Sequence, residues 1–405
     1  MEKKNFIWNV IGLSFNSFIS LILLILVKRI NGIETAGIFT YAFSLSCLFF
    51  IISSFYNRTF QVSEYKREYS FGDYFTSRII FVVISFILGI IFCFINGFEK
   101  YKVFVILLLL IYKSIEAICD SIFGQIQIEG NLYKTGISYT LKSILGMVAF
   151  LIIDLYTKNL LLAITGLFTS SILILFIYDI PSLKEKFPKL KFKKDTFIKL
   201  LGITAPIFIY TFLQNYLSNS QKMLMTYFIG NKLQTIFGIL IMPATMLIIV
   251  GNYIVMPFLN SLTSKYKEKK YNEFDNVVSK MCICLFSIGI ICVLLAYFLG
   301  VPVLNFIYNI DLKAYKMMLI IIIIGSIFNA ITMVLSNVLT IMTINKRQTV
   351  IYFIMSIIAS IITVVMAHFY GINGLCYSYL MSFTILFVIY YSFYKIQIKK
   401  LEKKI

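Results

Sequence analysis

Residues Val103–Phe123, with the sequence VFVILLLLIYKSIEAICDSIF, are apolar and numerous enough to cross a bilayer, yet three of them are charged. The three are Lys113, Glu116 and Asp120, whose spacing of three and four residues places them along one face of a helix. A charge near the bilayer centre costs about 2.5–3.5 kcal/mol on insertion scales, so such residues face protein or a water-filled cavity. The next apolar segment repeats the feature with Lys142. The chain is therefore predicted to build a polar cavity inside a membrane bundle.

The overall composition is that of a membrane protein. Of the 405 residues, 60% are hydrophobic and only 14% are charged, and the mean hydropathy is +0.88. A soluble domain is about half apolar and about a quarter charged, so this composition predicts an integral membrane protein. The 37 lysines and arginines outnumber the 18 acidic residues. The positive-inside rule explains this excess better than nucleic-acid binding does, so no nucleic-acid partner is expected.

Cysteine and histidine give no sign of a metal or redox site. The seven cysteines fall inside apolar segments, and the chain has a single histidine, His368. We interpret the cysteines as small packing residues and expect no disulfide, no metal ion and no cofactor. The chain also lacks P-loop and Rossmann motifs, so ATP is not expected to be its direct energy source.

Runs of about 20 apolar residues predict an all-α polytopic membrane protein with about 12 transmembrane helices. The predicted spans are 6–28, 36–56, 78–97, 103–123, 135–155, 159–180, 198–219, 233–256, 280–300, 316–342, 349–368 and 373–395. The Lys-rich segment 181–197 is predicted to be a cytoplasmic linker between two pseudo-symmetric six-helix lobes, 1–180 and 198–405. Anionic lipid headgroups would attract the lysines of this linker.

Lysine and arginine are concentrated in alternate loops. If the N-terminus lies inside, the segments assigned to the cytoplasm hold most of these residues. The positive-inside rule therefore predicts that both termini are cytoplasmic, which requires an even number of spans.

Short segments in about the first 80 residues resemble one family of transporters. They are NSFIS (16–20), VKRI (27–30), AGIFTYA (36–42), NRTFQVS (57–63) and EYSFGDY (68–74). These segments resemble the bacterial Wzx-type polysaccharide and O-antigen flippases. That family belongs to the multidrug/oligosaccharidyl-lipid/polysaccharide (MOP) exporter superfamily.

The resemblance implies two six-helix lobes around a cationic central cavity. It implies that the cargo is an undecaprenyl-pyrophosphate-linked oligosaccharide repeat unit for capsule, O-antigen or exopolysaccharide. The cargo would cross the bacterial plasma (inner) membrane by alternating access with H+ or Na+ coupling, and a polysaccharide polymerase and a chain-length regulator are the implied partners. The chain departs from many relatives at Gln221-Lys222, where they carry an acidic–basic pair.

The candidate ligands of a pyrophosphate group are five cations: Lys142, Lys113, Arg29, Arg58 and Lys222. Lys142 is the strongest candidate, because no acidic residue lies within one helical turn of it and another helix or a ligand must balance its charge. Arg29 and Arg58 stand at span ends and are equally well explained as interfacial anchors. Lys113 is equally well explained by a structural ion pair with Glu116.

Glu116 and Asp120 are the candidate ion-coupling residues. Two carboxylates four residues apart on one helix face repel each other, which favours protonation of one of them. The alternative is that Glu116 neutralises Lys113 and that Asp120 lies near the interface. Asp154 and Asp179 stand at span ends and are predicted to be interfacial.

Polar residues also line the seventh predicted span. Gln214, Asn215, Ser218 and Asn219 form a polar stripe that would line the cavity. Amides and hydroxyls of this kind bind glycans, and equally well hydrogen-bond neighbouring helices. Pro206 predicts a kink in the same span.

Two other functions remain as alternatives to a flippase. A multidrug or organic-cation antiporter of the same superfamily would share the fold, but lysines in the cavity favour an anionic cargo. A membrane-embedded glycan polymerase or glycosyltransferase would be expected to have a large outer loop with arginines or an Asp-x-Asp motif. The chain has neither, so we predict a transporter without enzymatic activity and without catalytic residues.

Overall fold

The computed structural model describes residues 2–55, 57–64, 68–184, 187–190, 192–255, 258–342 and 344–402, and these residues form helices joined by short turns. Within this described part, 10 helices or helix runs are long and apolar enough to cross a membrane. A further helix of 29 residues, α5 (Lys100–Ile128), carries the three charged side chains of the central stretch. The chain is a multi-pass membrane protein, and the predicted all-α class is confirmed.

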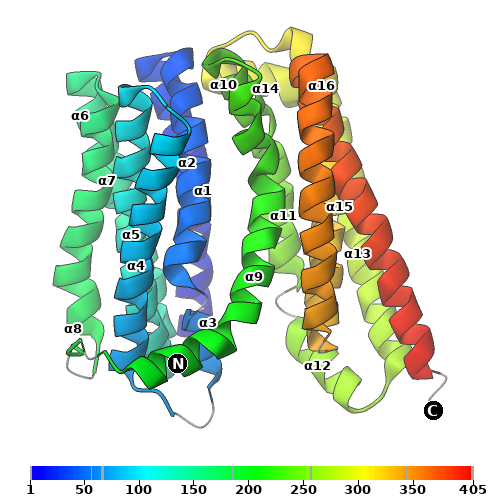
Figure 1. Cartoon of the computed structure of the whole chain (residues 1–405). Coiled ribbons are helices and arrows are strands. Elements are labelled where there is room, and N and C mark those ends of the chain that lie inside the picture. Colours follow the sequence, from blue (N-terminus) through cyan, green and yellow to red (C-terminus); the bar gives the residue numbers. More distant parts are fainter. Residues whose placement is uncertain are drawn as a thin grey trace. The chain divides into compact units, whose positions relative to one another are not determined.

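The chain divides into two compact units, the first ending at Asn215 and the second beginning at Tyr216. Besides α5, the first unit contains α1 (Glu2–Asn31), α2 (Ile33–Ser54), α3 (Asn57–Ser63), α4 (Phe71–Ile95), α6 (Leu132–Thr157), α7 (Leu160–Ile174), η1 (Leu175–Asp179), α8 (Ile180–Ser182) and the first part of α9 (Lys194–Leu224). The six spans predicted for the first half lie on α1, α2, α4, α5, α6 and the run from α7 to α8 (Figure 1).

Small residues let two helices of the first unit approach closely. A Cβ atom added to Gly12 of α1 would lie 2.3 Å from the carbonyl oxygen of Gly136 in α6. One added to Gly136 would lie 2.1 Å from the carbonyl oxygen of Trp8. Because both obstacles are backbone atoms that no rotamer change removes, α1 and α6 are packed backbone against backbone.

The second unit contains the rest of α9, η2 (Met225–Tyr227), α10 (Asn231–Leu240), α11 (Met242–Val255), α12 (Leu259–Lys267), α13 (Tyr271–Leu295), η4 (Ala296–Gly300), α14 (Val301–Tyr308), η5 (Lys313–Tyr315), α15 (Lys316–Ile341) and α16 (Asn345–Glu402). At its centre is α15, most of whose apolar residues are buried. It packs against α11, α13 and α16.

The last two predicted spans both lie on α16. Gly371 interrupts this element with φ 55° and ψ −131°, a conformation that residues with a side chain avoid. The orange and red halves of α16 run in opposite directions on either side of this point (Figure 1). The two spans predicted at 349–368 and 373–395 are therefore separate crossings.

Each unit contains a π-helical turn followed closely by a proline. The first turn, η1, is followed by Pro181, and the second, η4, is followed by Pro302. A proline has no N–H for the carbonyl four residues earlier, and its ring crowds that carbonyl. The local hydrogen bonding shifts instead, and the N–H of Ile180 bonds to the carbonyl of Leu175 five residues earlier. Through this turn Asp179 lies in the protein interior.

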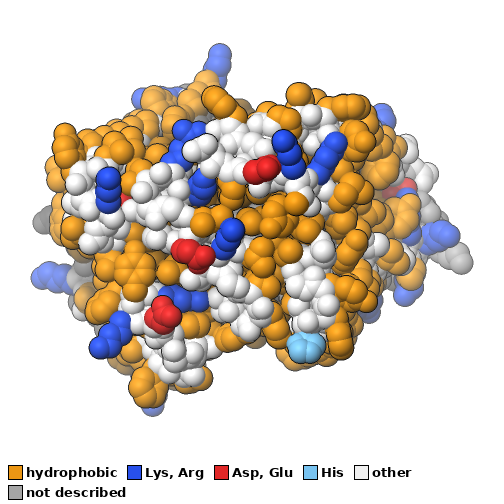
Figure 2. Space-filling model, turned by 90° about the horizontal axis from the view of Figure 1, so that it is seen from above, with side chains coloured by type: hydrophobic (Ala, Val, Ile, Leu, Met, Phe, Trp, Pro, Cys, Tyr) orange, Lys and Arg blue, Asp and Glu red, His pale blue; other side chains and the backbone are white. Residues whose placement is uncertain are grey.

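Large apolar side chains cover the outside of the helices. On α4, Ile87, Ile91 and Phe94 are exposed, and on α13 so are Ile291 and Leu294. Exposed apolar bands of this kind belong in the hydrocarbon of a bilayer. At one end of the molecule, lysine, arginine and acidic side chains are scattered among hydrophobic ones (Figure 2).

Candidate functional site

The first unit encloses a group of seven charged side chains that we call the buried charge cluster. Its members are Arg58, Arg78, Lys113, Glu116, Asp120, Lys142 and Asp179. They come from α3, α4, α5, α6 and η1, and the most exposed of them, Arg58, shows 20% of its side chain. Four cations thus lie among three carboxylates inside this helical bundle.

Three members form the Arg58–Asp120–Arg78 triad. Asp120 accepts a hydrogen bond at Oδ1 from Nη1 of Arg58, at 3.0 Å, and another at Oδ2 from Nη2 of Arg78, also at 3.0 Å. Arg58 also donates through Nη2 to Oε1 of Gln127, at 3.1 Å. The triad joins α3, α4 and α5, so Asp120 has protein partners on two other helices.

Lys113 and Glu116 form an ion pair one turn apart on α5, with 2.6 Å between Nζ and Oε2. The Lys113 ammonium also lies 5.0 Å from the ring centre of Phe43 in α2. The structure therefore contains the ion pair that one of the two interpretations of Lys113 expected. Both side chains are largely buried, so the pair replaces the hydration that each charge has lost.

Lys142 of α6 is paired with Asp179 of η1. The charge that the sequence left unbalanced is therefore balanced by another helix, 37 residues along the chain. Asp179 was predicted to be interfacial, and the structure shows that its side chain is fully covered by protein and paired with Lys142. The proline-bounded π turn directs this last residue of the turn into the protein interior.

A cavity lies between the two lysine–carboxylate pairs. Its empty space is about 430 Å³, including the part open to solvent. Glu116 and Lys142 line it, together with aromatic rings that include those of Tyr112, Phe123 and Tyr139. Sites that bind small molecules have this mixture of an apolar wall and a few polar groups.

Phe123 and Tyr139 connect the parts of the cluster. The ring centre of Phe123 lies 4.9 Å from Nζ of Lys142 and 5.8 Å from Cζ of Arg58. Arg58 also donates through Nη1 to the hydroxyl of Tyr139, at 3.4 Å. Cations over aromatic rings are stabilised by the ring quadrupole, so the Phe123 ring is shared by a cation from α3 and a cation from α6.

The other candidate cations lie outside this cluster. Arg29 is exposed at the last turn of α1, and Lys222 is half-buried on α9 in the second unit. The polar stripe is half-buried along α9, with Gln214 and Asn215 in the first unit and Ser218 and Asn219 in the second. Within the stripe, the Asn215 amide donates to the carbonyl of Thr211 at 2.9 Å.

Asp154 is a second acidic residue that protein covers. It was expected at the interface, and it is fully buried near the end of α6. Its Oδ1 accepts a hydrogen bond from the amide of Asn31 at 2.9 Å. The neighbouring end of α1 covers this carboxylate, and hydropathy along a single segment carries no information about such cover.

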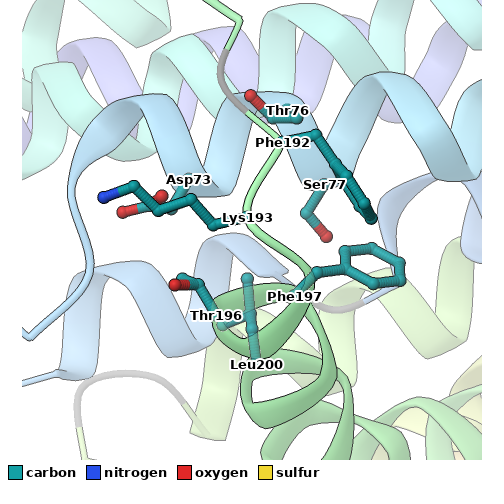
Figure 3. Close-up of a pocket in the computed structure, with 8 residues that line it drawn as sticks. All are labelled: Asp73, Thr76, Ser77, Phe192, Lys193, Thr196, Phe197 and Leu200. Carbon is teal, nitrogen blue, oxygen red and sulfur yellow. The ribbon is translucent and has the colours of Figure 1, made fainter.

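A smaller pocket of about 220 Å³, including its open part, lies where the chain enters α9. Figure 3 shows that Asp73 and Ser77 reach it from α4, Phe192 and Lys193 from the segment leading into α9, and Phe197 from the start of α9. The rings of Phe192 and Phe197 lie 5.7 Å apart, so the wall of the pocket is mainly aromatic packing. It is separate from the buried charge cluster, and it contains none of its members.

The fully buried polar side chains described in the second unit are neutral. Gln348 accepts hydrogen bonds at Oε1 from Ser336 at 3.0 Å and from Tyr390 at 3.3 Å, and its Nε2 donates to Thr340 at 3.1 Å. Among the described residues, every buried charged side chain belongs to the first unit. The same described part contains no group of three or more His, Cys, Asp or Glu side chains that could hold a metal ion.

Sequence reasoning missed two members of the cluster. Arg78, at the start of the third predicted span, was not among the candidate cations, yet its side chain is fully buried. Asp179 was assigned to the interface. The only sequence signal for either residue was its position at the edge of an apolar run. Buried and interfacial charges both occur at such positions, so this signal does not distinguish them.

Comparison with known proteins identifies the fold. No family model matches the chain. The capsular polysaccharide biosynthesis protein CapF of Staphylococcus aureus is 26% identical over 331 residues, which cover 80% of this chain and 82% of that protein.

Three solved structures are similar over nearly the whole chain, each with 13% sequence identity. An inward-facing multidrug resistance MATE family transporter of the MOP superfamily has a TM-score of 0.70, covering 98% of this chain and 99% of that one. The MATE transporter VcmN of Vibrio cholerae in its bent form has a TM-score of 0.62, covering 98% and 97%. A MOP superfamily transporter of Pyrococcus furiosus, whose binding pocket has reverse polarity, has a TM-score of 0.59, covering 98% and 95%. The chain therefore has the fold of the MOP superfamily transporters, as the resemblance in its first segments predicted.

Proposed function

We propose that this protein is a flippase for an undecaprenyl-pyrophosphate-linked oligosaccharide repeat unit in the bacterial plasma membrane. The observation that carries the proposal is the buried charge cluster, in which cations outnumber carboxylates. A buried surplus of positive charge is costly unless an anion balances it, and a pyrophosphate is such an anion. The sequence similarity to a capsular polysaccharide biosynthesis protein supports a role in surface glycan assembly.

The mechanism that we propose is alternating access of two lobes, 1–180 and 198–405, joined by the linker 181–197. Both termini are cytoplasmic in this scheme. The isoprenoid tail stays in the lipid, while the pyrophosphate and the sugars follow a polar path. Proton or sodium coupling would act through Glu116 or Asp120, the two carboxylates that α5 contributes to the buried charge cluster.

The test is deletion of the gene in a host that makes the surface polysaccharide, followed by complementation. Surface glycan and lipid-linked repeat units on the cytoplasmic side are both measured. We expect deletion to abolish surface glycan and to trap repeat units inside the cell. Unchanged surface glycan after deletion would overturn the proposal.

Complementing variants separate the role of Lys142 from its ion pair. Lys142→Ala should insert and fail to restore export. The exchanged pair Lys142→Asp with Asp179→Lys keeps the ion pair but moves the cation from α6 to η1. Full export by the exchanged pair means that Lys142 has a structural role, whereas failure of a stably inserted exchanged pair assigns the α6 cation to the cargo.

A multidrug or organic-cation antiporter is the second candidate. The observation that favours it is the carboxylate of Glu116 in a cavity walled by Tyr112 and Phe123, since carboxylates and aromatic rings also bind organic cations. The solved MATE transporters with the same fold are consistent with it. In the deletion strain, loss of dye efflux with normal surface glycan would select this function.

A further inference from the structure

The charge surplus of the buried charge cluster is located in one place. Two of its three parts are neutral lysine–carboxylate pairs. The third part, the Arg58–Asp120–Arg78 triad, has two guanidinium groups and one carboxylate. The triad therefore carries the unbalanced positive charge of the cluster.

Asp120 satisfies these arginines only in part. Each of its oxygens meets a single nitrogen of one arginine, so neither guanidinium has the two-pronged pairing that it prefers with an anion. Nε and Nη1 of Arg78 have no hydrogen-bond partner among the described residues, although the side chain is fully buried. Buried N–H groups without acceptors cost free energy. Asp120 provides too few acceptor oxygens for both arginines, so additional acceptor oxygens would stabilise the triad.

Two members of the triad are partly exposed. Arg58 and Asp120 keep 20% and 15% of their side chains exposed, whereas the side chain of Arg78 is fully buried. Arg58 belongs to α3, a helix of seven residues. An anion arriving at the triad therefore meets Arg58 and Asp120 before it meets Arg78.

We propose that Asp120 is an internal stand-in for a phosphoanion. In this exchange a phosphate or pyrophosphate group displaces the Asp120 carboxylate and is held between Arg58 and Arg78, whose unpaired nitrogens gain acceptor oxygens. The exchange makes Asp120 a competitor that sets the affinity of the site, and it assigns Arg78 to the ligand. This inference takes its ligand chemistry from the proposed function, but its test is a binding measurement that needs no export.

The test is binding of inorganic pyrophosphate to the purified full-length protein in nanodiscs of phosphatidylcholine, measured by titration calorimetry. Asp120→Asn keeps the shape of the side chain and removes the competing charge. Because a hydrogen bond to a charged group is worth more than a neutral one, we expect Asp120→Asn to bind pyrophosphate at least about tenfold more tightly than the wild type. Unchanged or weaker binding by a folded Asp120→Asn protein would overturn the proposal.

Arg58→Gln keeps the inference testable if Asp120→Asn does not fold. It leaves a neutral Arg78–Asp120 pair, and the partly exposed position of Arg58 tolerates the loss of a charge. We expect this variant to lose pyrophosphate binding, and binding equal to the wild type would refute the exchange. Lys100→Gln is the matched control, because it removes an exposed cation from the opposite end of α5 and should leave binding unchanged.

A second arm identifies the source of the phosphoanion. The titrations are repeated in nanodiscs that contain phosphatidylglycerol. Pyrophosphate affinity that does not depend on the lipid identifies a phosphate group delivered from water or on the cargo. If the gain in pyrophosphate affinity of Asp120→Asn is seen in phosphatidylcholine but not in phosphatidylglycerol, an anionic lipid headgroup occupies the site. Either result supports the exchange.

Failure of this inference can be told from failure of the flippase proposal. If deletion traps repeat units but Asp120→Asn gains no affinity, the flippase stands and the exchange falls. If Asp120→Asn gains affinity while deletion leaves surface glycan unchanged, the anion site stands without the flippase.

Discussion

In the first unit, Lys142 and Asp179 are buried as an ion pair, whereas in the second unit Gln348 is buried among Ser336 and Tyr390 as a neutral network. Both arrangements join different helices through buried polar side chains. They differ in how they respond when an ion binds nearby. The hydrogen bonds of a neutral network are little affected by a new charge, whereas the attraction within an ion pair is changed by it.

The comparison assigns different tasks to the two polar interiors. The second unit holds α15 to both halves of α16 through hydrogen bonds that bring no net charge. The first unit has charged side chains around a cavity, so the electrostatic energy of this unit depends on the charge of any ligand bound there. We therefore expect ligand-dependent changes to begin in the first unit, and the following substitutions test this contrast.

The largest effect is expected from breaking one buried ion pair. Lys142→Ala leaves Asp179 buried without its cation, which costs about 3–5 kcal/mol of unfolding free energy. The paired variant Lys142→Leu with Asp179→Leu should recover most of this loss. Chemical denaturation of the purified protein in mixed micelles measures both, and equal stability of the single and paired variants would contradict the ion-pair account.

A smaller effect is expected from the neutral network. Gln348→Leu removes the acceptor of Ser336 and Tyr390, and we expect a loss of about 1–3 kcal/mol of unfolding free energy. The same denaturation experiment applies. A loss as large as that of Lys142→Ala would remove the energetic difference between the two interiors.

Close packing of α1 against α6 is expected to matter about as much. Gly136→Ala brings a methyl group against the backbone at Trp8, and overpacking of this kind costs about 1–3 kcal/mol. Gly202→Ala in α9 is the matched control, because a Cβ there meets nothing within 4 Å and the change should be neutral or stabilising. If both variants have the Tm of the wild type, the backbone contact does not constrain α1.

The smallest effect is expected at the surface ion pair of Lys265 and Glu273 in the second unit. Its members lie at the ends of α12 and α13, where water and salt screen their attraction. Lys265→Gln should leave Tm unchanged at every salt concentration tested. A drop in Tm that salt abolishes would show that charge also contributes to the stability of the second unit.

Much of the fold could be predicted from the sequence. Hydropathy places the spans because a bilayer requires long apolar helices, and the pair of Lys113 and Glu116 follows from spacing within one helix. The pair of Lys142 and Asp179 did not follow, because it joins residues on different helices through a π turn. Arg78 was missed for the same reason, since its burial depends on what α3 and α5 place in front of it.

The contact between α1 and α6 also lies beside the residue that dominates the fluorescence of the protein. Trp8 is the only tryptophan of the chain, and its carbonyl is the atom that Gly136 approaches. Tryptophan emission therefore comes from the first unit alone, while far-ultraviolet circular dichroism sums the helices of both. Followed together through one melt, the two signals coincide if the units unfold as one and separate if they do not.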